Sequence, residues 1–503
     1  MKKQFTSNHR NAKVGFCPKV AISIPEGGTL RSLLALTFLI ASPLVVWAKL
    51  GQSSRPNIVL VMTDDQGYGD LGFTGNPILK TPHIDGFARE SVRFTDFHVS
   101  PTCAPTRTSL MTGRHEFRSG VTHTILERER MSLKAVTIAQ VLNKSGYATG
   151  IFGKWHLGDE DPYQPNQRGF DEVFIHGAGG IGQTYAGSCG DAPGNKYFDP
   201  AILHNGRFEK TKGYCTDVFF QQALSWMNVE REKKSPFFAY IALNAPHAPL
   251  DCPEEYRKHY DGKVDNNAAR FFGMIENIDD NFGRLLAKLK EWDIERDTLV
   301  IFMTDNGGTA GVKVFNAGMR GQKATPYEGG THVPSFWRWP AGFKGGLDCN
   351  ALTAHIDIFP TFATIANATV PQSVRLDGRN LLPLLKNPQA KWQDRFLFTH
   401  VGRWAPGKAE DAKFKNCSVR NSRFHFVNDS ELFDLKSDPG EKENVIANFP
   451  EVVAKMRSAY DQWWNEILPA LENENAVGPK VNPFKERYWK QFGGGPETLP
   501  GAN

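Results

Sequence analysis

A cysteine and an arginine stand four residues apart in the segment Cys103-Ala-Pro105-Thr-Arg107. Proline is common in the first turn of a helix and glycine just beyond the last, so Pro105 and Gly113 predict a short helix over 105–112. Cys103 would lie at its amino end, where unpaired N–H groups carry a partial positive charge that suits an anion. The pattern indicates a nucleophile beside an anion site. A buried structural cysteine is the alternative, because short motifs also match by chance.

Two other segments end an apolar run with a pair of oxygen ligands. Asp64 and Asp65 end one run, and Asp305 and Asn306 end a second run of similar sequence. Ligands of an open parallel sheet bind beyond the carboxyl ends of its strands, so we expect these four side chains to meet. Three carboxylates and an amide would need a cation between them, and an all-oxygen set favours calcium or magnesium over zinc. The alternative for either pair alone is a helix cap or a turn.

Three further loops bring cationic or titratable side chains to the same expected edge of the sheet. Lys154 and His156 follow one apolar run, His247 follows another, and Lys323 lies in a loop after a third. A single lysine or histidine in a loop is usually only solvated, but three such loops at one edge indicate a site. Together with Arg107 and a metal, they would hold a tetrahedral oxyanion ester and stabilise charge on the leaving oxygen.

Apolar runs alternate with amphipathic segments from residue 57 onward, and these elements must position the side chains named above. The apolar runs predict buried strands at 58–62, 147–152, 237–243 and 299–303. Helical spacing predicts helices at 134–145, after a cap at Asp217, and at 266–291. This alternation predicts an α/β fold with a large, mostly parallel sheet between helices. Residues 170–215 are rich in Gly, Asn, Asp and Pro and are expected to form a long loop.

The pattern of predicted elements changes after about residue 390. Short strands are expected at 396–400, 424–427 and 431–435, followed by a helix at 450–467, which predicts a smaller antiparallel sheet with a helix on it. We therefore expect a signal peptide at 1–48, a catalytic domain at 55–388, a C-terminal α+β subdomain at 389–470 and an extended tail at 471–503.

The amino terminus has the pattern of a secretory signal: basic residues precede an apolar run from Leu33 to Trp47, with small residues near Ala48. Export to the periplasm or the medium is expected. An uncleaved anchor is the alternative, but the run contains Pro43 and is shorter than the ~20 residues that span a bilayer, so we expect no stable membrane span. Five cysteines besides Cys103 would remain after cleavage, an odd number; a Cys189–Cys215 bridge is one possible pairing.

The balance of charges does not indicate a nucleic-acid partner. The 503 residues carry a net charge of +5, and 22% of them are charged. No basic stripe interleaved with aromatic residues is present, which argues against nucleic-acid binding. A mild positive balance is compatible with an anionic substrate but does not by itself identify one.

Several of these motifs, in this order, resemble the type I sulfatases, the arylsulfatase family of the alkaline phosphatase-like superfamily. The resemblance runs from about residue 55 to 470 and includes Cys-x-Pro-x-Arg, the two strand ends with their oxygen ligands, Gly153-Lys-Trp-His-Leu-Gly158, Pro246-His-Ala-Pro249 and Lys323-Ala-Thr-Pro-Tyr-Glu-Gly-Gly330. The segment Glu431-Leu-Phe-Asp-Leu435 resembles the C-terminal subdomain of the family. Thr106 departs from the family, where serine is commoner, but it keeps a hydroxyl.

The resemblance implies that Cys103 is converted after translation to formylglycine (3-oxoalanine) by a maturation enzyme. Hydration gives a geminal diol; one hydroxyl attacks sulfur, and deprotonation of the other expels sulfate. The resemblance further implies calcium held by the modified residue 103 and the four oxygen ligands named above.

The resemblance also assigns the remaining roles. Arg107 and Lys154 would fix diol and sulfate oxygens, and His156 would act as the base. His247 and Lys323 would face the leaving oxygen, His247 as the proton donor.

The expected activity is hydrolysis of a sulfuric ester of a small molecule or glycan, with aryl sulfates as generic substrates. Two alternatives stay open: a phosphodiester or phosphonate ester hydrolase on the same scaffold, and a non-catalytic binding protein with an unmodified Cys103. Specificity is expected from the loops at 159–215, 309–322 and 400–420. The candidate residues there are His176, Tyr185, His204, Arg207, Arg403 and Trp404.

Overall fold

The computed structural model describes residues 55–495. The expected signal peptide at 1–48 lies outside these residues. Within the described part of the chain, no helix is long and apolar enough to cross a membrane.

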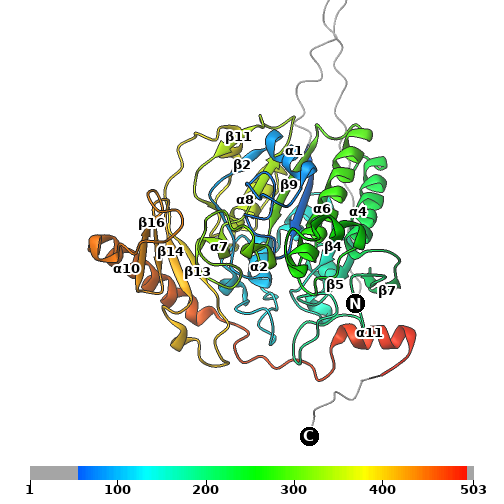
Figure 1. The fold of residues 1–503 in the computed structure, drawn as a ribbon. Helices are drawn as coiled ribbons and strands as arrows, with labels where there is room; N and C mark the ends of the chain where they lie inside the picture. The colour runs from blue at the N-terminus through cyan, green and yellow to red at the C-terminus, as the bar shows by residue number, and fades with distance from the viewer. Residues whose placement is uncertain (1–54, 496–503) are drawn as a thin grey trace, which may run out of the picture. The chain divides into compact units, whose positions relative to one another are not determined.

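A ten-stranded mixed sheet forms the centre of the fold, in the order β11-β2-β10-β9-β1-β8-β4-β5-β6-β7 (Figure 1). Its central strands, β9, β1, β8, β4 and β5, are mutually parallel, whereas β10, β6 and β7 pair antiparallel with their neighbours. The bounds of the strands are β1 Asn57–Thr63, β2 Val92–Phe94, β4 Ala148–Lys154, β5 Glu172–His176, β6 Ala201–His204, β7 Arg207–Lys210, β8 Phe237–Ala242, β9 Thr298–Thr304, β10 Ser335–Arg338 and β11 Leu347–Cys349. Two short strands, β3 Phe97–His98 and β12 Thr353–Ala354, pair separately.

Helices cover both faces of this sheet, which explains why its strands are apolar on both sides. Ile58, Leu60 and Met62 of β1 join a core with α2 Cys103–Thr112, α3 Ile138–Lys144 and α8 Ile358–Ile365. The alternate residues Val59 and Val61 join a second core with α1 Pro82–Glu90, α4 Cys215–Glu232 and α6 Asn266–Glu291. Alternate side chains of a strand point to opposite faces, so each face is buried under its own helices. Short helices lie at α5 Glu254–Arg257, α7 Glu328–Thr331 and α9 Leu382–Lys386.

A four-stranded antiparallel sheet with one long helix follows the large sheet. Its strands are β13 Leu397–His400, β14 Cys417–Arg420, β15 Phe424–Val427 and β16 Glu431–Asp434, and the helix is α10 Pro450–Ile467. Arg420 of β14 forms ion pairs with half-buried Asp96 (3.0 Å) and with buried Glu328 (2.8 Å), and the second pair ties this sheet to the segment that carries Lys323. The predicted fold class, a large sheet between helices with a smaller antiparallel sheet and helix, is confirmed. The domain boundary at 388/389 stays a prediction.

Several local predictions were wrong. The segment 170–215 is not one long loop, because β5, β6 and β7 extend the large sheet there. Asp217 does not cap α4; the cap is Tyr214, and the Asp217 carboxylate accepts hydrogen bonds from Asn277 and Asn281 of α6.

Two further differences lie at the ends of elements or of the chain. The helix expected at 134–145 begins only at Ile138, after a capping box at Thr137. The segment expected to be an extended tail contains α11 Pro483–Phe492, whose Phe484 is fully buried. The six cysteines in residues 55–495 are free thiols, so the Cys189–Cys215 bridge is not formed.

Candidate active site

The central strands deliver the predicted side chains to one edge of the large sheet. Strands β9, β1, β8 and β4 are adjacent, and Thr63 of β1 is in register with Thr304 of β9. Asp64 and Asp305 therefore continue from the same level of the sheet. The other predicted residues leave the sheet at that edge as well: Asp65 after β1, Asn306 after β9, His247 after β8, and Lys154 and His156 at the end of β4.

Helix α2 adds the cysteine and the arginine to this edge. It begins at Cys103, two residues before the predicted start, and ends at Thr112, with Gly113 as its C-cap. Cys103 and Arg107 are both buried and lie one turn apart on the helix. The sequence predicted Cys103 at the amino end of this helix with Arg107 one turn in; the structure places Cys103 within the helix, as its first residue.

Three cations each pair with one of the three carboxylates. The Arg107 guanidinium donates to Asp305 Oδ2 through Nη2 (2.8 Å) and Nε (3.1 Å). Lys154 Nζ lies 2.5 Å from Asp64 Oδ2, and Lys323 Nζ lies 2.5 Å from Asp65 Oδ1. Buried charges require such pairing, because removal from water costs several kcal/mol per ion.

Asp65 connects the metal-ligand candidates with the histidine of the β8 loop. Its Oδ1 accepts a hydrogen bond from Asn306 Nδ2 (2.9 Å), and its Oδ2 lies 3.8 Å from His247 Nε2. The Asp65 backbone has a positive φ of 66°, as does His156 with 59°. Positive φ is uncommon for residues other than glycine, and such strain concentrates at functional sites.

Burial and neighbouring charges shift the pKa values of the three carboxylates in different directions. Burial, together with the charge of Asp65, raises the pKa of Asp64 to about 7, although Lys154 opposes the rise. Burial and Asp64 likewise raise the pKa of Asp305 to about 6. Burial also opposes ionisation of Asp65, but Lys323 and His247 outweigh it and hold the pKa of Asp65 well below its usual range. Carboxylates crowded in this way favour a bound cation.

The Cys103 thiol lies in a positive local field. Burial alone would raise its pKa, but Lys154 and Lys323 outweigh burial and lower the pKa below the ordinary value. A group that becomes anionic at this position is therefore stabilised by the protein.

The two histidines present different ring nitrogens to the site. His156 Nε2 donates to the carbonyl oxygen of Thr124 (2.9 Å), so Nδ1 keeps its lone pair, and this buried atom has no hydrogen-bond partner among residues 55–495. A Cβ atom at Gly179 would lie 2.8 Å from the His156 ring, so glycine is required beside it. His247 Nδ1 donates to the carbonyl oxygen of Ala248 (2.7 Å), which turns Nε2 toward Asp65.

A cleft of about 310 Å³ opens onto these groups, a volume typical of small-ligand pockets. Cys103, His156, His247 and Lys323 line it, which brings together residues from α2, β4, the β8 loop and the loop after β9.

Only some of the residues predicted to determine specificity line this cleft. Tyr185 and Arg403 line the cleft, whereas His176 and Trp404 are buried, and His204 and Arg207 lie on β6 and β7 outside its lining. Gln183 and Cys189, which also line it, lie in the loop at 159–215 that was expected to give specificity, whereas His123, Thr124 and Ile125 were missed. No spacing signal marks them, because the fold alone brings their loops to the cleft.

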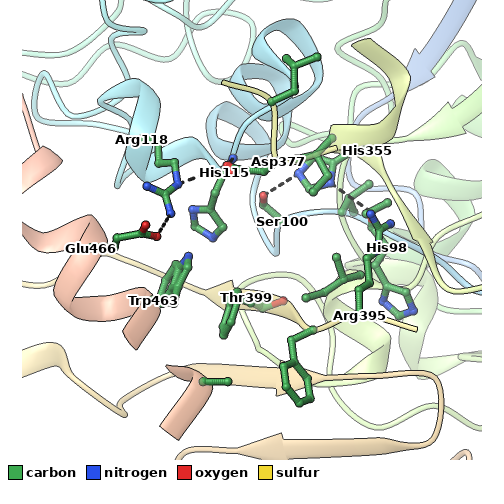
Figure 2. A pocket seen from close by; sticks show the side chains of 18 of the residues that line it. His98, Ser100, His115, Arg118, His355, Asp377, Arg395, Thr399, Trp463 and Glu466 are labelled. Atoms are coloured by element: carbon green, nitrogen blue, oxygen red, sulfur yellow. Dashed lines mark hydrogen bonds and ion pairs between the residues drawn. The ribbon is translucent and has the colours of Figure 1, made fainter. Parts of the chain in front are cut away.

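A second cavity, of about 500 Å³, lies between the α2 segment and the small sheet (Figure 2). It contains none of the predicted catalytic residues. Its charged groups neutralise one another: Arg118 pairs with Asp377 and Glu466, and Arg395 pairs with Asp357. Figure 2 also shows uncharged polar side chains of the lining, among them Ser100, which is hydrogen-bonded to His355. This cavity therefore lacks the set of Cys103, His156, His247 and Lys323 that lines the first cleft.

Comparison with known proteins gives matches along most of the chain. A family model described as Sulfatase matches residues 56–368, and a model described as N-sulphoglucosamine sulphohydrolase, C-terminal matches residues 322–465. These two spans include every residue of the site described above.

Relatives and solved structures cover similar spans. Arylsulfatase J of Mus musculus is 30% identical in an alignment that covers 86% of this chain and 79% of that protein. N-acetylgalactosamine-6-sulfatase of Homo sapiens is 30% identical in an alignment that covers 90% of this chain and 94% of that protein. The crystal structure of Ps i-CgsB is 28% identical with a TM-score of 0.73, covering 86% of this chain and 97% of that one, and the same protein has been crystallised with k-i-k-neocarrahexaose.

Proposed function

Because this chain belongs to the sulfatase family and is an enzyme that hydrolyses sulfuric esters, we propose that it releases sulfate from sulfated carbohydrates through a formylglycine made from Cys103 and a bound calcium ion. The observation that carries the proposal is the convergence of the oxygen ligands, three cations and two histidines on Cys103. The carbohydrate substrate is supported by relatives that are named as N-acetylgalactosamine-6-sulfatases and by the oligosaccharide crystallised with Ps i-CgsB.

The metal part of the proposal rests on two orphaned oxygens. Asp64 Oδ1 and Asn306 Oδ1 are buried and have no hydrogen-bond partner among the described residues, although buried polar atoms are normally paired. With Asp65 and Asp305 they form an all-oxygen donor set, which fits calcium, with residue 103 completing the site. When bound, the cation would withdraw negative charge from the ester oxygens. Magnesium fits less well, because it prefers to keep several waters.

Formylglycine at position 103 would supply, once hydrated, an oxygen nucleophile. The second hydroxyl of the diol would then release sulfate, so the covalent intermediate would need no attacking water. The protein prepares this position in two ways. Lys154 and Lys323 favour negative charge on residue 103, and Arg107 lies one turn along the same helix. We propose that Arg107 and Lys154 orient the sulfate oxygens, and that a maturation enzyme modifies Cys103 before it is buried in the folded chain.

The two histidines would divide the proton transfers between them. His156 can accept a proton at Nδ1, because its Nε2–H is committed to Thr124. His247 Nε2 and Lys323 Nζ lie on the Asp65 side of the cleft, where they can deliver a proton to the leaving oxygen and stabilise its charge.

Export is proposed from the basic and apolar pattern of residues 1–48. The phosphodiesterase alternative is not favoured, because the relatives that match at 30% identity are sulfatases. A non-catalytic binding protein is not favoured either, because all flanking residues of the site are present.

The direct test compares 4-nitrophenyl sulfate with bis(4-nitrophenyl) phosphate, using protein from a host that makes formylglycine. We expect kcat/KM for the sulfate to exceed that for the phosphodiester by at least about 100-fold. A panel of sulfated sugars then ranks the natural substrates by sulfate release. Preference for the phosphodiester, or release of sulfate from aryl esters but from no sugar, would contradict the proposal.

A further inference from the structure

Two segments of the cleft lining carry side chains that the catalytic roles leave unused. His123 and Thr124 come from the loop after η1 Glu116–Ser119, and Arg403 comes from the loop after β13 of the small sheet. Both segments therefore bring side chains to the cleft that contains Cys103.

The backbone around Arg403 is fixed against the other segment. The Arg403 N–H donates to the carbonyl oxygen of Thr122 (3.2 Å), and the Gly402 N–H donates to His400 Nδ1 (2.9 Å). Gly402 and Arg403 both have positive φ, 68° and 62°, and a Cβ atom at Gly402 would lie 1.9 Å from the Thr122 oxygen. An arginine held in this strained conformation indicates that its position is built into the loop.

The Arg403 side chain reaches the cleft with its charge largely unused. Its Nη2 donates to Thr124 Oγ1 (3.2 Å), and no carboxylate of residues 55–495 forms an ion pair with it. The nearby Arg128 and Arg130 differ, because each pairs with a glutamate. A guanidinium still has donors left after one hydrogen bond, and these donors suit carboxylate or sulfate oxygens.

His123 adds a neutral donor beside this cation. Its Nδ1 accepts hydrogen bonds from the N–H groups of Thr124 (2.8 Å) and Ile125 (3.1 Å), so the proton of the ring sits on Nε2. Burial, reinforced by the charges of Arg128 and Arg403, lowers the pKa of His123 to about 3 and keeps the ring neutral. This part of the lining thus offers one exposed cation on a fixed backbone and one N–H donor, a combination that is complementary to an anion.

We propose that Arg403, assisted by His123, binds a second anionic group of the substrate, so that the enzyme prefers sulfated carbohydrates that carry another sulfate or a carboxylate near the scissile ester. This inference rests on the proposed function and names the substrate class more narrowly. The catalytic groups hold the reacting sulfate at Cys103, while Arg403 selects the ligand from another part of the lining of the same cleft.

The test measures competitive inhibition of 4-nitrophenyl sulfate hydrolysis. One pair of inhibitors is galactose 6-sulfate and galactose 2,6-disulfate. The other is galactose 6-sulfate linked to glucose or to glucuronic acid. The readout is the ratio of the two inhibition constants within each pair, which cancels general changes in the enzyme. For the unaltered enzyme we expect the dianionic member of at least one pair to bind about tenfold more tightly, as one charge-assisted hydrogen bond provides.

Arg403→Gln keeps the size of the side chain and removes its charge, so the ratio should fall to near one. Arg403→Lys should retain part of the preference for the dianionic inhibitor. Arg207→Gln, on the exposed strand β7, is the matched control and should leave the ratio unchanged. If Arg403→Gln loses the preference within the disulfate pair, Arg403 binds a second sulfate. If it loses the preference within the glucuronic acid pair, Arg403 binds a carboxylate.

A ratio near one in the unaltered enzyme, or the same ratio in Arg403→Gln, would overturn the inference and leave the sulfatase assignment intact. Absence of 4-nitrophenyl sulfate hydrolysis in protein with formylglycine would overturn the proposed mechanism, and this inference with it.

Discussion

Replacement of Asn306 by aspartate tests the metal site without any measurement of activity. Asn306 is fully buried, and its Nδ2 donates to Asp65 Oδ1 at 2.9 Å. In the Asn306→Asp variant a carboxylate oxygen faces another at this distance. Two unit charges so close repel by about 6 kcal/mol at an effective dielectric constant of 20. The cost is limited to about 4 kcal/mol at pH 7, because one carboxyl can take up a proton instead.

We therefore expect the metal-free variant to lose roughly 2–4 kcal/mol of unfolding free energy, which for a chain of this length lowers Tm by about 2–4 °C. Calcium should recover most of this loss, because a cation turns the added carboxylate from a repelling neighbour into a ligand. The assay is thermal unfolding followed by circular dichroism, with a chelator and then with excess calcium.

Asn281→Asp provides the matched control. Asn281 is also a buried asparagine, and its Nδ2 donates to the carboxylate of Asp217 at 2.6 Å, in helix packing rather than at the strand ends. It should be destabilised in the same way but should not respond to calcium. Equal calcium responses in the two variants, or none in Asn306→Asp, would refute the reasoning.

Three further substitutions test other parts of the account. Cys103→Ala should abolish turnover while shifting Tm only slightly, because little volume is lost; residual turnover of aryl sulfate by this variant would exclude residue 103 as the nucleophile. His247→Ala should reduce kcat/KM for sugar sulfates by about 100-fold or more and for activated aryl sulfates by less than about tenfold, and equal losses would argue against a proton donor. Phe484→Ala should cost about 3–5 kcal/mol of local stability and speed amide hydrogen exchange across α11; unchanged protection would show that this contact does not hold the helix.

The sequence predicted the elements whose patterns are long or strongly apolar. Strands β1, β4, β8 and β9 and helix α6 were found within one or two residues, because their patterns persist over their whole length. Strands β5, β6 and β7 were missed, because they are short and lie within a segment rich in turn-forming residues. Helix α11 was missed although Asn482 and Pro483 provide a capping signal, because only tertiary packing reveals that Phe484 is buried.

The residues of the site also fall into those that the sequence could place and those that it could not. Motif residues such as Asp64 and Lys154 could be placed, because the ends of parallel strands meet at one edge of a sheet. His123 could not be placed, since a lone histidine in a loop carries no pattern. Its role as a donor depends on two backbone N–H groups that only the folded loop positions.

The central claim is that residue 103 does not act as a cysteine, and mass spectrometry of the peptide that contains it tests this most directly. In enzyme purified from its own host, the peptide should be lighter by about 18 Da than the sequence requires, since an aldehyde replaces the thiol. The fraction of lighter peptide should rise in proportion to the rate of aryl sulfate hydrolysis across preparations. Full hydrolytic activity in protein whose residue 103 is an unmodified thiol would contradict the account.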